Sequence, residues 1–325
     1  MHGLNGNAKG TWTSDSGVFW PADLLPKLGP KNARVLSYGY NSHVTSFSDG
    51  VSRDGVLQHA ESLAGALSAN RNVRQQQHLA QTAKVTPTLY EPLTDFLLQL
   101  HNAIDRPIIF VCHSLGGLVV KRALIYCRSL AHENVEHLRA IYISTYGILF
   151  LGTPHNGTDV AKWAHMLQSI SGVIVPKKFM DSSSTLVRAL KTNSELLQNI
   201  NSGFADISSR FHMYFFHETR TTRIGATREM IVDENSAAPY IEGVERMGIE
   251  ADHSQIAKFD SENAPGYEAV AEALLRYSRA APKKIAERWI EEKKIRLLEK
   301  QTNAIDDFES KRPSTPFPLA GDIQG

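Results

Sequence analysis

The chain has 325 residues, a formal net charge of +1 and an apolar fraction of 42%. This length allows one large α/β domain or two smaller domains, and the near-zero net charge gives no electrostatic reason to expect nucleic-acid binding. The only two cysteines are Cys112 and Cys127, so a disulfide framework is not expected and an intracellular, cytoplasmic location fits best. No apolar run approaches the roughly 18 residues that span a bilayer, and no signal peptide opens the chain.

Three elements are predicted before residue 105. A strand is predicted at residues 34–40, and helices at 52–69 and 89–104, where apolar side chains recur at helical spacing. The next stretch, residues 107–117, is the most informative one. A short apolar run ends at Ser114, two glycines follow, and apolar residues then recur with a helical period. This pattern predicts a buried strand, a sharp turn that carries Ser114, and a helix.

The second half of the chain alternates in the same way. Strands are predicted at 146–152, 211–217 and 228–233, and a closing helix at 267–279. Residues from about 160 to 205 are helical or loop-like and form a candidate lid. Because strands alternate with helices, we expect an α/β fold with a mostly parallel central sheet and helices on both faces.

The character of the chain changes after Pro282. A charged, partly amphipathic helix is predicted from Lys284 to Lys300, and the proline-containing segment from Thr302 onward is predicted to be disordered. We therefore expect a domain over residues 1–281 and a separate charged helix and tail over 282–325.

A serine nucleophile needs a base, an acid that orients the base, and an oxyanion hole. Candidates follow Ser114 in the chain order serine, acid, histidine. Glu218 stands just past a predicted strand, Asp233 occupies a similar place after the next one, and His253 lies in a polar loop before the closing helix. The spacing alone leaves Glu218 and Asp233 open as the acid.

The oxyanion hole needs two backbone N–H groups. One is expected from Leu115, the residue after the nucleophile. The second is expected from Leu4, because the glycines of the loop His2-Gly3-Leu4-Asn5-Gly6 let its backbone approach a substrate oxygen.

Five ordered motifs carry a resemblance to a known family. They are His-Gly-Leu-x-Gly at residue 2, Thr-Trp at 11, His-Ser-Leu-Gly-Gly-Leu-Val at 113, Phe-Leu-Gly-Thr-Pro-His-x-Gly at 150 and Asp-His-Ser at 252. Together they resemble the lipase-like serine esterases of the α/β-hydrolases, in the branch that holds the serine active site-containing protein and the N-terminal hydrolase domains of fungal NOD-like receptors. The resemblance covers about residues 2 to 280. It implies an α/β-hydrolase fold, ester hydrolysis on lipid-like substrates, Ser114 as nucleophile, His253 as base and Glu218 as the favoured acid.

The chain departs from that family in two places. Cys112 stands where the nucleophile motif Gly-x-Ser-x-Gly has its first glycine. In the resembling fold a strand also precedes the His-Gly-Leu loop, next to the strand that leads to the nucleophile, and this chain opens at Met1-His2. We therefore expect that strand to be missing.

The same residues also allow roles outside catalysis. Ser114 alone fits an ordinary helix N-cap, Glu218 fits a surface ion pair with a nearby arginine, and His113 and His155 fit packing or loop-stabilising roles. No residue cluster has metal-ligand spacing and no nucleotide loop is present, so no metal and no cofactor are expected.

Two hypotheses follow. The first is a serine hydrolase that cleaves a small-molecule or lipid ester through an acyl-enzyme. The second is a catalytically weak or inactive hydrolase-fold module of a larger, receptor-type signalling protein, with a downstream signalling domain as fusion or partner. Peripheral contact with a membrane, including an organelle membrane, is compatible with the first hypothesis, whereas nucleic acid is not an expected partner.

Overall fold

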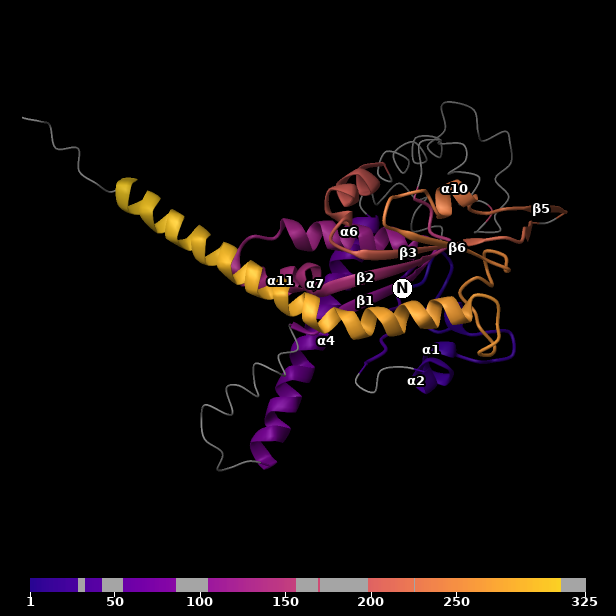
Figure 1. Ribbon diagram of the computed structural model, residues 1–325, viewed down its shortest axis with the longest axis horizontal. Helices are drawn as coiled ribbons and strands as arrows, with labels where there is room; N and C mark the ends of the chain where they lie inside the picture. The colour runs from indigo at the N-terminus through magenta and orange to yellow at the C-terminus, as the bar shows by residue number, and fades with distance from the viewer. Residues whose placement is uncertain are drawn as a thin grey trace, which may run out of the picture.

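The computed structural model describes residues 1–28, 33–42, 55–85, 105–155, 169, 198–224 and 226–310. At its centre is a sheet of four parallel strands in the order β1-β2-β3-β6. Figure 1 shows the strands side by side with helices packed around them. The strand bounds are β1 Ile108–His113, β2 Thr145–Leu151, β3 His212–Glu218 and β6 Glu245–Ile249.

The central strands are buried on both faces. All seven residues of β2 are buried, which is why its sequence reads as a continuous apolar run rather than as an alternation. Helix α6 (Gly116–Ser129) covers one face of the sheet, and α11 (Tyr267–Ser310) covers the other (Figure 1). Helices α4 (Gly55–Val85) and α7 (Glu136–Ser144) pack against α6. The expected α/β architecture, with a parallel sheet between helices, is confirmed.

The strand predicted at residues 34–40 is wrong. Residues 33–42 have no strand assignment, and Val35 and Leu36 are 47% and 49% exposed. These apolar side chains contribute little buried area, and little burial means little stabilisation from a place in the sheet.

One edge of β1 is where a further strand of this sheet would pair. Among the described residues, no strand pairs with the edge of β1 that faces away from β2. Met1 lies along this edge instead: its amino group donates to the Val111 carbonyl at 2.7 Å, and its own carbonyl accepts from the His113 N–H at 3.0 Å. Met1 thus satisfies the carbonyl of Val111 and the N–H of His113, two backbone groups at this edge of β1.

The strand predicted at 228–233 is also misplaced. Only its first two residues, 228 and 229, are in a strand: they belong to β5 (Thr227–Glu229), which pairs antiparallel with β4 (Thr222–Ile224) in a separate two-stranded sheet. The fourth strand of the main sheet is β6, which the sequence analysis did not find. Its burial pattern is mostly intermediate or exposed, so it lacks the apolar run that marks β1 to β3.

The closing helix runs through Pro282 instead of stopping before it. Helix α11 is continuous over 44 residues, and Tyr277, Ala281, Ile285 and Trp289 recur every four residues on its buried face. Because this apolar stripe packs on the core before and after the proline, tertiary contacts outweigh the lost backbone hydrogen bond. The expected boundary at residue 282 therefore falls inside a helix, and residues 302–310 are helical rather than disordered.

The helix predicted at 52–69 is confirmed and extends further, as α4. The helix predicted at 89–104 and most of the candidate lid lie outside the described residues; within residues 160–205, residues 198–205 belong to a helix over 198–208. In the described part of the chain no helix is both long enough and apolar enough to cross a bilayer.

Candidate active site

Ser114 lies on the turn between the end of β1 and the start of α6. Its φ of 52° is in the left-handed region, which a side-chain-bearing residue adopts only when its surroundings hold it there. The Ser114 N–H donates to the Leu151 carbonyl at 3.0 Å, and the Thr153 hydroxyl donates to the Ser114 carbonyl at 2.9 Å. Strand β2 and the residues after it thus hold the strained turn in place.

Cys112 takes the position of the usual first glycine at this turn and is fully buried. Burial raises the pKa of its thiol to about 12, so the side chain is a neutral, small apolar group at physiological pH. The turn accommodates it without losing the strand-to-helix geometry.

The His253 ring lies between Ser114 and Glu218. Its Nε2 is 3.0 Å from the Ser114 hydroxyl, and its Nδ1 is 2.7 Å from Glu218 Oε2. A carboxylate accepts from Nδ1–H, which leaves Nε2 to accept from the Ser114 hydroxyl. The structure therefore joins these three residues, which are far apart in the chain, by two consecutive hydrogen bonds.

Glu218 is completely buried at the carboxyl end of β3. Its Oε1 accepts from the backbone N–H groups of Ile231 and Val232 at 2.6 and 3.2 Å, so the carboxylate is satisfied without an arginine partner. Asp233, the alternative acid, is exposed and accepts from the Ser236 N–H as the N-cap of α10 (Glu234–Ala237). Of the two candidate acids, the structure places only Glu218 against His253.

The loop at the chain's opening lies directly on the turn that carries Ser114. A Cβ placed on Gly3 would be 2.6 Å from Ser114 Cβ, and one on Gly116 would be 2.4 Å from the His2 carbonyl oxygen. Only glycine permits this approach. Within the described residues, the N–H groups of Leu4 and Leu115 have no hydrogen-bond acceptor, and their side chains are buried in one apolar cluster. The other buried members of that cluster are Leu118, Ile231, Val232 and Ala237.

A second buried polar cluster includes Lys121 of α6, and the sequence analysis missed it. Lys121 Nζ is 2.7 Å from both His155 Nδ1 and Asn201 Oδ1. Burial lowers the pKa of Lys121 to about 7 and lowers that of His155 as well. A lysine at apolar helical spacing in the sequence was the only signal that could have pointed to it.

A polar cleft lies beside the loop of His253, and Ser114 does not line it. Its charged lining residues are Asp15, Arg220, Arg223, Arg228, Glu250, Asp252, Lys258 and Asp260. Over the described ranges, no three His, Cys, Asp or Glu side chains are arranged to hold a metal ion.

The reactive groups of this site stand where parallel strands end, with the serine on the turn from strand to helix. This arrangement is the α/β-hydrolase fold, and the chain has that fold.

The chain is similar in sequence to Protein SERAC1. Protein SERAC1 of Danio rerio is 29% identical over 276 residues, which cover 79% of this chain and 35% of that protein. Protein SERAC1 of Homo sapiens is 25% identical over 244 residues, 70% of this chain and 30% of that protein. The chain thus spans about a third of the length of these relatives. No protein-family model matches the chain.

A solved structure, the mature lipase BlEst2 of Bacillus licheniformis, is similar at 16% identity with a TM-score of 0.43. The match covers 85% of this chain and 89% of the lipase chain.

Proposed function

We propose that this protein is a serine hydrolase that cleaves carboxylic esters through an acyl-enzyme. The observation that carries the proposal is the pair of hydrogen bonds from the Ser114 hydroxyl to His253 and from His253 to Glu218, at 3.0 and 2.7 Å. A buried carboxylate that accepts from Nδ1–H keeps Nε2 free to take a proton.

The reaction follows from these positions. Ser114 Oγ attacks the ester carbonyl while its proton passes to His253 Nε2, and Glu218 stabilises the imidazolium that forms. When the tetrahedral intermediate collapses, the C–O bond to the alcohol breaks and His253 returns the proton to the leaving oxygen. Water, deprotonated by His253, then cleaves the acyl-enzyme and releases the carboxylic acid.

The negative charge of each tetrahedral intermediate needs donors that are already in place. We assign this role to the backbone N–H groups of Leu4 and Leu115, which have no acceptor within the described residues. The apolar cluster around both side chains keeps water from competing for these donors.

We also propose membership of the lipase-like serine esterase family, with a small-molecule or lipid ester as substrate. The five ordered motifs support the family, and the matches to Protein SERAC1 cover up to 79% of this chain. The substrate class rests on the family resemblance and on the apolar surroundings of Leu4 and Leu115. An intracellular location and peripheral contact with a membrane stay predictions.

The second candidate function is a hydrolase-fold interaction module without turnover. The observation that favours it is Cys112 in place of the first glycine of the serine turn, because the chain there departs from the nucleophile motif Gly-x-Ser-x-Gly of working serine hydrolases.

Hydrolysis of short-chain p-nitrophenyl esters separates the two functions. We expect turnover by the wild-type protein and a loss of at least about 10³-fold in kcat/KM for Ser114→Ala. Ser129→Ala is the matched control, because Ser129 lies at the far end of α6 and bonds only to the Tyr126 carbonyl in the described structure. Wild-type turnover that Ser114→Ala leaves intact would contradict the proposal.

A further inference from the structure

The backbone N–H and the backbone carbonyl of His253 are each held by a residue of another element. Its N–H donates to Thr222 Oγ1 of β4 at 3.2 Å, and its carbonyl accepts from the Nε2–H of His113, the last residue of β1, at 2.9 Å. A carbonyl can only accept, so this bond fixes the proton of His113 on Nε2.

From outside the loop around His253, the Arg220 N–H also donates to the Ala251 carbonyl, two residues before His253, at 3.1 Å. The Asp252 side chain accepts from the N–H groups of Ser254 and Gln255 at 2.9 and 3.1 Å, but these bonds lie within the loop. Residues 250–255 belong to no helix or strand. Contacts from outside the loop must therefore set where the His253 backbone stands relative to Ser114.

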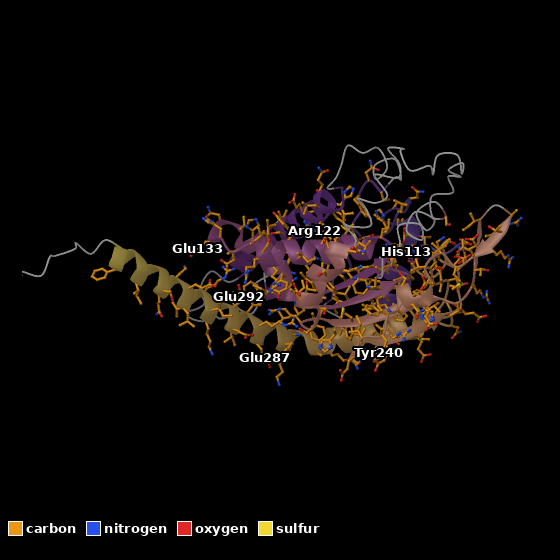
Figure 2. All side chains as sticks on the ribbon, turned by 90° about the horizontal axis from the view of Figure 1, so that it is seen from above. His113, Arg122, Glu133, Tyr240, Glu287 and Glu292 are labelled. Carbon is orange, nitrogen blue, oxygen red and sulfur yellow. The ribbon has the colours of Figure 1, made fainter. Side chains whose placement is uncertain are left out.

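His113 is well placed to do this because it precedes Ser114 in the chain. It ends a strand that is paired with β2 along its whole length, so one rigid element carries the serine and also holds the histidine that must meet it. Figure 2 labels His113 over the main body of the molecule, away from the projecting end of α11.

We propose that His113 is a positioning residue, which acts through His253 by fixing its backbone where the ring Nε2 reaches the Ser114 hydroxyl. This inference rests on the proposed function and adds a residue to it. A misplacement of about 1 Å in such a site costs on the order of 10²-fold in rate, which sets the scale of the expected effect.

The charge state of His113 suits this role. Burial and the neighbouring His253 lower the pKa of His113 to about 3, so it stays neutral at physiological pH. The two rings are 5.1 Å apart, and a charged His113 would oppose the imidazolium that forms on His253 during turnover.

Two amide substitutions test the hydrogen bond with little change in polarity. The Gln side chain of His113→Gln brings an N–H to about the place of Nε2, whereas the shorter side chain of His113→Asn does not reach it. We expect kcat to fall about 10- to 100-fold in His113→Asn with KM within about twofold, and His113→Gln to stay within about threefold of wild type. His137→Gln, at an exposed histidine of α7, is the control and should leave both constants unchanged.

Equal kcat values for His113→Asn and wild type, or equal losses in the Asn and Gln variants, would overturn the inference. Failure of the proposed function is seen separately, as no ester turnover by the wild-type protein. In that case amide hydrogen exchange of residues 250–256 decides: faster exchange in His113→Asn than in His113→Gln supports the positioning role, and equal exchange contradicts it.

Discussion

At the scale of single residues, the site depends on buried polar groups that the fold has already satisfied. Glu218 receives two backbone N–H bonds besides the one from His253. These bonds fix the position of the carboxylate in the protein interior. The residue can therefore orient the imidazole of His253.

The choice of acid gives a direct prediction. In Glu218→Gln the amide still accepts from the backbone but presents its NH₂ to His253, which forces the imidazole into the wrong tautomer. We expect kcat to fall about 10³- to 10⁴-fold. Asp233→Asn is the matched control, since it retains the oxygen that caps α10 and should stay within about threefold of wild type. Ester hydrolysis measures both, and a greater loss in Asp233→Asn would assign the acid to Asp233.

The sequence placed the three site side chains at recognisable positions, although its spacing left Asp233 open beside Glu218 and only the family resemblance favoured Glu218. Ser114 ends an apolar run before two glycines, Glu218 ends another, and His253 follows in a polar loop. The bond from His113 to His253 could not be found in this way. It joins residues 140 positions apart, and only the packing of the loop on β1 brings them together.

At the scale of elements, the close contact between the opening loop and α6 decides the shape of the candidate oxyanion hole. Gly116 is the first residue of α6, and a Cβ on it would be 2.4 and 2.6 Å from the carbonyl oxygens of His2 and Met1. Both contacts are with backbone, which cannot rotate away as a flexible side chain can. The loop that carries Leu4 would have to move.

We therefore expect Gly116→Ala to lower stability by roughly 1–3 kcal/mol and to reduce ester hydrolysis about 10-fold or more. Gly65→Ala is the control: Gly65 lies in α4 with nothing within 4 Å of the added Cβ, and alanine there should be neutral or stabilising by about 0.5–1 kcal/mol. Thermal unfolding and hydrolysis assays measure both. Equal stability and equal hydrolysis rates in the two variants would contradict a role for the contact between the loop and α6.

The strands that the sequence predicted best are those with apolar runs. Apolar runs located β1, β2 and β3 to within about two residues. Strand β6 was missed because it is at the edge of the described sheet and exposes every second residue or more. The continuity of α11 through Pro282 depends on the packing of Ile285 and Trp289 on the core. The helix propensity of the local sequence does not predict such packing.

At the scale of the whole molecule, the buried cluster of Lys121, His155 and Asn201 ties α6 to the residues after β2 and to the helix over 198–208. Lys121 also lies over the rings of Phe150 and Phe204, with Nζ 5.6 and 5.3 Å from their centroids. An amine enclosed in this way is stable in the fold only when uncharged or well compensated.

The lowered pKa of Lys121 makes folding depend on pH. Its value is about 7 in the fold against 10.5 normally, so between these values the unfolded chain binds a proton that the folded protein lacks. The free energy of unfolding should then rise with pH across this window, by up to about 1.4 kcal/mol per pH unit. Below pH 7 Lys121 is protonated in both states, so its contribution to the free energy of unfolding stays at its lowest value.

The comparison with Lys121→Met isolates this contribution. We expect the variant to lose that part of the rise in urea-unfolding free energy between pH 7 and 10, while Lys283→Met, at an exposed lysine of α11, keeps the wild-type profile. The same pH dependence in wild type and Lys121→Met would show that the buried amine does not titrate in this range.

The most direct test of the central claim is the site of covalent labelling by a fluorophosphonate, mapped by peptide mass spectrometry. Only a serine activated by an adjacent base reacts quickly with such a probe. The hydrogen bond from the Ser114 hydroxyl to His253 predicts one adduct per chain, on Ser114, which is lost in Ser114→Ala and strongly slowed in Glu218→Gln. A folded wild-type protein that stays unlabelled, or is labelled elsewhere, would contradict the proposal that Ser114 is a working nucleophile.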